Sequence, residues 1–107
     1  MSTYKVVLLV REVSSEQLQA LYVRENLQLP FVPTIGMSFK QGTSTWLWET
    51  SKGELMPTVE AVTYDLDEEM FVCLLTVNQP LKASFWTKLE GADLERSIYL
   101  TYFQARS

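Results

Sequence analysis

The residue types that carry most acid, base and nucleophilic chemistry are scarce in this sequence. It contains no histidine and a single cysteine, Cys73. Without histidine, Ser-His and Cys-His nucleophile pairs, histidine-based metal sites and the most common general base are all excluded. Cys73 lies within the most apolar run of the chain, which indicates a buried and inert thiol. We therefore expect no catalytic residue, no metal and no cofactor.

Carboxylates offer the one remaining route to such chemistry. The densest group is Asp65-Leu-Asp-Glu-Glu69, which could hold a hard cation. A calcium loop of the helix-loop-helix type needs glycine at its sixth position and glutamate at its twelfth, where this chain has Met70 and Thr76. We interpret the segment as a solvated turn. An enzyme that works through carboxylates alone, for example Glu60 with Asp65, is the least favoured function because no spacing selects such a pair.

Three tryptophans are the residues best suited to binding. Trp46 and Trp48 are two positions apart in a predicted strand and would share one face, while Trp86 falls on the polar face of another. A partly exposed tryptophan is a common anchor of a binding surface. Trp46, Trp48 and Trp86 are our ligand or interface candidates; the alternative is that they belong to the core.

Size and charge restrict the class of protein. The 107 residues fit a single domain over 1–107, and the composition, 47% hydrophobic and 21% charged, is that of a folded domain. The net charge is −4, and the nine basic residues form no cluster, which argues against nucleic acid or an anionic membrane as a partner. The longest early apolar run, Val6–Val10, is too short for a signal peptide or a membrane span. We expect a cytoplasmic protein.

A predicted hairpin organises the fold. Residues 59–65 and 70–77 are rich in β-branched and aromatic side chains and flank the acidic segment. In the second run both faces are apolar, with Met70, Val72 and Leu74 on one face and Phe71, Cys73, Leu75 and Val77 on the other. Such a strand must be covered on both sides. Val6–Val10 predicts a second interior strand of the same kind.

Residues 14–25 admit two interpretations. Ser14 followed by Gln17 is a capping-box pattern, and Leu18, Leu21 and Tyr22 recur at helical spacing, which favours a helix of about three turns. The alternative is an edge strand that continues to Leu29. Pro30 ends either element, because the residue before proline is disfavoured in the α region.

The remainder predicts short strands and tight turns. Residues 29–39 should be extended because they contain two prolines, 41–43 should turn, and 45–49 should be a strand followed by a loop at 50–53. Residues 81–90 alternate as in a strand, although a helix would also fit, and 98–103 is strand-like.

These elements predict a mainly β (α+β) fold. We expect an antiparallel meander of about seven strands, curled into a sheet or small barrel, with one short helix after the first strand. Two strands that are apolar on both faces need more cover than one short helix provides. We therefore expect the sheet to close on itself or a second copy to cover it, which predicts a homodimer.

The sequence favours a non-catalytic protein-interaction or oligomerisation module that acts through an aromatic surface. The alternative is a small barrel that binds an apolar or aromatic ligand, because a closed meander encloses a cavity.

Overall fold

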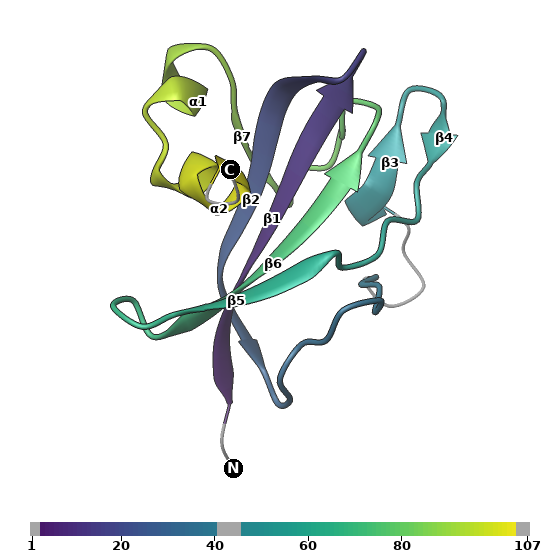
Figure 1. Cartoon of the computed structure of the whole chain (residues 1–107). Helices are drawn as coiled ribbons and strands as arrows, with labels where there is room; N and C mark the ends of the chain where they lie inside the picture. The colour runs from purple at the N-terminus through teal and green to yellow at the C-terminus, as the bar shows by residue number, and fades with distance from the viewer. Residues whose placement is uncertain (1–2, 41–45, 105–107) are drawn as a thin grey trace.

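A computed structural model describes residues 3–40 and 46–104, without the side chains of Trp46, Phe103 and Gln104. The turn expected at 41–43 lies outside this range. One mixed sheet of five strands has the order β5-β6-β1-β2-β7, and a separate two-stranded hairpin pairs β3 with β4 (Figure 1). The strands are β1 (Tyr4–Ser14), β2 (Gln17–Leu29), β3 (Glu49–Thr50), β4 (Gly53–Glu54), β5 (Ala61–Asp65), β6 (Met70–Val77) and β7 (Thr87–Leu89). The helices are η1 (Trp46–Trp48), α1 (Ala92–Glu95), η2 (Ile98–Leu100) and α2 (Thr101–Gln104).

The helix predicted after the first strand is wrong, and the alternative of a strand that continues to Leu29 is correct, although β2 pairs with both β1 and β7 and is therefore not an edge strand. β2 pairs antiparallel with β1, and Ser14 lies opposite Gln17. Ser15 and Glu16 between them both have positive φ, of 53° and 62°. Two such residues make the two-residue turn that matches the twist of a hairpin. The four residues that resemble a capping box therefore close a hairpin.

The hairpin of β5 and β6 is confirmed, but the antiparallel meander is not. β5 pairs antiparallel with β6, as expected. β6 then pairs parallel with β1, the central strand of the sheet. The sheet ends at β5 on one side and at β7 on the other, so it is open and the expected barrel does not form.

Both faces of the sheet are covered by the chain itself. Val6, Leu8 and Val10 point to one face, where residues 47–59 and 81–86 pack against them. Val7 and Leu9 point to the other face, which Leu94, Tyr99, Leu100 and Tyr102 cover. Figure 1 shows the helices α1 and α2 on one side of the sheet and the β3–β4 hairpin on the other. Neither face therefore needs a second copy for cover, so this reason for expecting a homodimer does not hold.

Other local predictions are corrected in part. Residues 46–48 form η1 where a strand was expected, although the loop at 50–53 does close a hairpin between β3 and β4. Within 81–90 only Thr87–Leu89 is a strand. Residues 98–103 form η2 and α2. Just before η2, the side-chain hydroxyl of Ser97 accepts a hydrogen bond from the backbone N–H of Tyr99, as an N-cap residue does.

Among the described residues, no helix has the length and apolar character needed to cross a membrane.

Candidate functional site

The structure brings two of the three candidate tryptophans together inside the core. The rings of Trp48 and Trp86 are 5.2 Å apart between centroids, and the residues are 2% and 7% exposed. The indole N–H of Trp48 donates to the carbonyl of Phe39 at 2.7 Å, and that of Trp86 donates to the carbonyl of Leu47 at 2.8 Å. Both polar groups of the pair are thus satisfied internally.

The expected exposure of Trp86 is therefore wrong, and the core alternative holds for Trp48 and Trp86. Trp86 does not lie in a regular strand: it precedes β7, in a turn where alternation no longer determines the side-chain direction. The side chain of Trp46 lies outside the described part of the structure. No described tryptophan presents an open binding surface.

A different aromatic group is exposed. Tyr4, Tyr64 and Phe71 come from β1, β5 and β6 and pack edge to face around Phe71, with centroid distances of 6.0 Å to Tyr4 and 4.8 Å to Tyr64. Tyr4 is 37% exposed and Tyr64 45% exposed. We call the three residues the aromatic patch; it was missed as a group because Tyr4 is far from Tyr64 and Phe71 in sequence. Alternation in the predicted hairpin could have placed Tyr64 beside Phe71, but not Tyr4.

The aromatic patch adjoins the open edge of β5. Residues Gly36 and Met37 bond to Val59 just before this strand, at 2.8 and 2.9 Å. From Ala61 onward no described strand pairs with the outer side of β5. Alternate N–H and C=O groups of an edge strand point away from its neighbour and can pair with another chain.

The acidic segment forms the turn between β5 and β6, as expected. Asp65 accepts hydrogen bonds from the N–H groups of Asp67 and Glu68 at 3.0 and 2.9 Å, and from the hydroxyl of Tyr102 at 2.6 Å. These bonds, that of Tyr102 first, lower the pKa of Asp65. No described group of three or more acidic, cysteine or histidine side chains is arranged to hold a metal. The turn is a surface of negative charge.

Cys73 is fully buried in β6, where it pairs with Val62 of the neighbouring strand β5. Desolvation raises the pKa of its thiol to about 11. Cys73 is therefore an inert core residue, as predicted.

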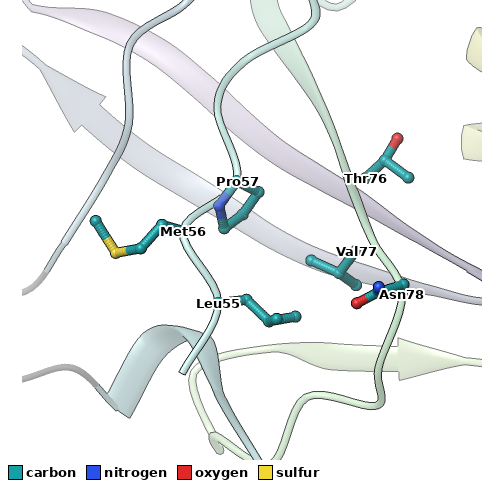
Figure 2. A pocket seen from close by; sticks show the side chains of 6 residues that line it. All are labelled: Leu55, Met56, Pro57, Thr76, Val77 and Asn78. Carbon is teal, nitrogen blue, oxygen red and sulfur yellow. The ribbon is translucent and has the colours of Figure 1, made fainter. Parts of the chain in front are cut away.

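An apolar groove lies at the other end of β6. Leu55, Met56 and Pro57 form one wall, Thr76, Val77 and Asn78 form the other, and the volume is about 370 Å³. Figure 2 shows the side chain of Leu55 directed toward Val77 and Asn78, and that of Met56 directed away from them. Met56 is 68% exposed. The groove is thus a surface feature at the end of β6 and differs from the barrel cavity that the sequence suggested.

Comparison with known proteins gives no match: no family model, no curated protein and no solved structure corresponds to this chain.

Proposed function

We propose that this chain is a non-catalytic interaction module that binds an extended, basic segment of another protein along the outer edge of β5. The observation that carries the proposal is the unpaired edge of β5 beside the aromatic patch. An extended peptide that adds to a sheet edge gains main-chain hydrogen bonds from the strand, while exposed side chains provide specificity.

The side chains of β5 suit such an addition. Ala61, Val62, Thr63 and Tyr64 carry no charge, so none of the usual barriers to edge pairing interrupts the strand before Asp65. Tyr64 is the natural anchor, because aromatic side chains are enriched among the residues that dominate binding energy. Its packing on Phe71 holds the ring in place before a partner arrives, which reduces the entropy lost on binding.

The charge near β5 favours a basic partner. The turn after the strand presents Asp67, Glu68 and Glu69, all exposed, and none of the three forms an ion pair with a described residue. The chain as a whole carries a net charge of −4. Complementary charge accelerates encounter and rejects partners of the same sign, and salt weakens both effects.

Two synthetic peptides test this proposal. An octapeptide of alternating lysine and valine can form a strand with one basic face, and its control replaces each lysine with glutamate. We expect the lysine peptide to bind, with slower amide exchange in Ala61–Asp65 and an affinity that falls with added salt. The glutamate peptide should bind at least tenfold more weakly. Equal binding of the two peptides, or protection elsewhere in the sheet, would refute the proposed surface.

A matched pair of variants locates the anchor. Tyr64→Ala removes the exposed ring at β5 and should weaken binding of the lysine peptide at least tenfold, as for the minority of interface residues whose truncation costs more than about 1 kcal/mol. Ile98→Ala removes a side chain that is 66% exposed and lies in the C-terminal segment, so it should leave binding unchanged. The opposite order of effects would move the site to the C-terminal segment.

A second copy of the chain is the alternative occupant of the same edge. The expected homodimer would then form by pairing of the two β5 strands. Two β5 strands could pair antiparallel about Thr63, which would place Ala61 of each opposite Asp65 of the other. That arrangement brings the acidic turn of each copy toward Glu60 of its partner, which like charges disfavour. Sedimentation at micromolar concentration distinguishes the cases: a monomer supports the basic partner, and a dimer that Tyr64→Ala dissociates supports self-association.

The apolar groove supports a second candidate function, the binding of a small apolar ligand. Its wall residue Leu55 donates a backbone hydrogen bond to the carbonyl of Trp48 at 3.0 Å, so a ligand there should perturb the fluorescence of the buried tryptophan pair. A hydrophobic dye such as ANS should then shift tryptophan emission, and Val77→Asp should abolish that shift if the variant remains folded. An unchanged emission spectrum would remove this candidate.

A further inference from the structure

A polar cleft lies where β1 and β6 end. The two strands run parallel, so their carboxyl ends meet at the same end of the sheet (Figure 1). The turn of the β3–β4 hairpin reaches the same place and contributes Lys52. The cleft has a volume of about 500 Å³. It is lined by Glu12, Ser14, Ser15, Gln17, Gln19, Lys52, Asn78, Gln79 and Pro80.

Glu12 is the unusual member of this cleft. It is 8% exposed, and only Thr50 accompanies it among the buried polar or charged residues of the described chain. Burial of a carboxylate is costly unless the group is hydrogen-bonded or paired with a cation. Glutamate is almost never buried to this degree without such a partner.

Tyr22 satisfies only one oxygen of Glu12. The Tyr22 hydroxyl donates to Oε1 of Glu12 at 2.7 Å and accepts a hydrogen bond from the N–H of Leu81 at 3.3 Å. Burial, followed by the bond to Glu12, raises the pKa of Tyr22 well above its ordinary value, so the hydroxyl keeps its proton. That proton is directed to Oε1, and the carboxylate is held in one orientation.

The other oxygen of Glu12 is left available. The described residues provide no hydrogen bond to Oε2, and no described side-chain oxygen or nitrogen is both sealed from solvent and unpartnered. Oε2 therefore keeps contact with solvent, and Glu12 lines the polar cleft. A preoriented carboxylate oxygen at the floor of a polar cleft is an acceptor for a charged donor, which forms stronger hydrogen bonds than a neutral one.

We propose that the polar cleft binds a small zwitterion of the amino-acid class, whose ammonium group is held by Glu12 and whose carboxylate is held by Lys52. Two groups of opposite charge on opposite elements match the two ends of such a molecule. The hydroxyl and amide side chains that also line the cleft, those of Ser14, Gln79 and Asn78, can bond the rest of the ligand. The volume lies within the usual range for small-molecule sites, about 300–1,000 Å³.

A series of three related probes tests the assignment of charges. Serine carries both groups, N-acetylserine lacks the ammonium, and serinamide lacks the carboxylate. We expect serine to perturb the amide NMR signals of Glu12, Lys52 and Asn78 in the full chain, and each of the other probes to bind at least tenfold more weakly. Serinamide binding as tightly as serine would overturn the role of Lys52. N-acetylserine binding as tightly would overturn the role of Glu12.

Variants distinguish a loss of binding at the cleft from a loss of folding. Glu12→Gln can still accept the bond from Tyr22 but loses its charge, so serine affinity should fall at least tenfold. Lys52→Gln lies on an exposed turn and should lower the affinity for serine while leaving that for serinamide unchanged. Lys82→Gln, an exposed lysine outside the cleft, is the control and should change neither. Should Glu12→Gln fail to fold, Lys52→Gln still decides, and unaltered serine binding in that variant would refute the site.

Discussion

The two edges of the sheet differ in how they meet solvent. β7 is three residues long, exposes the charged side chain of Lys88, and pairs it with Glu90 at 3.6 Å. β5 is five residues long, carries no charge before Asp65, and exposes Tyr64. Short edge strands and exposed lysines are devices by which sheets prevent pairing with other chains. These devices are present at β7 and absent from β5 before Asp65.

The difference is what the proposed mode of binding at β5 requires. An unprotected edge invites aggregation, so a sheet that protects β7 would be expected to protect β5 as well unless a partner uses it. The acidic turn beside β5 limits association with further copies without blocking a basic segment. The following predictions test this comparison, from the largest expected effect to the smallest.

The largest effect is expected in β6, the core strand that pairs with β5 on one side and with β1 on the other. Leu74 in β6 is 6% exposed, and Leu74→Asp would bury an uncompensated charge between the sheet and its C-terminal cover. That cost is several kcal/mol against a total stability of about 5–15 kcal/mol. We expect an unfolded protein by circular dichroism. A cooperative thermal transition like that of the unsubstituted chain would contradict the placement of β6.

A smaller effect is expected when β5 is given an exposed lysine like that of β7. Tyr64→Lys places an exposed lysine on β5 and removes the aromatic anchor. We expect at least tenfold weaker binding of the lysine–valine peptide, while the free energy of unfolding from urea titration changes by less than about 1 kcal/mol, as for most surface substitutions. Retention of full binding would mean that the edge charge does not distinguish β5 from β7.

The C-terminal segment is attached at the end of β5, and its attachment should depend on pH. The hydrogen bond from Tyr102 helps to hold the pKa of Asp65 below the ordinary value of 3.8. A lowered pKa stabilises the fold above that ordinary value, and the stabilisation is lost as the pH falls through the pKa of Asp65 in the folded state.

Tyr102→Phe should therefore raise the pKa of Asp65 toward 3.8, as measured by NMR titration of the carboxyl carbon. The free energy of unfolding of the variant should be lower than that of the unsubstituted chain, and this difference should shrink as the pH falls below 4. The pKa of Tyr102 itself is raised from 10.0 to about 12, chiefly by burial, so its own contribution is complete below pH 10 and declines as the pH rises toward 12. An unchanged Asp65 titration would show that the bond does not form in solution.

The smallest effect concerns Cys73, whose reactivity reports whether β5 separates from β6 without global unfolding. Cys73 lies opposite Val62 of β5, and burial raises the pKa of its thiol to about 11. We expect no reaction with DTNB at pH 8 except at the rate of global unfolding. Faster labelling would show that β5 separates from β6 on its own, and that the two edges differ in stability rather than in accessibility.

The sequence predicted the parts of the fold that depend on local pattern. β6 and β1 are apolar on both faces at the expected positions, because alternation and burial act on neighbouring residues. The acidic turn and the inert thiol of Cys73 followed from the same patterns.

The remaining features depend on contacts between distant residues. Ser15 and Glu16 adopt a turn that glycine or asparagine usually signals, so the first hairpin was mistaken for a helix start. The parallel pairing of β6 with β1 is set by long-range packing. The same holds for the site, because the aromatic patch joins three strands and the burial of Trp86 depends on η1 and its carbonyl at Leu47.

Amide hydrogen exchange along β5 in the free protein tests the open edge most directly. If the outer side of β5 is unpaired, exchange in Ala61–Asp65 should alternate between slow amides bonded to β6 and fast amides facing solvent, and β6 should be slow throughout. Uniformly slow exchange along β5 in a monomeric protein would show that the edge is already occupied, and would contradict the proposed mode of binding.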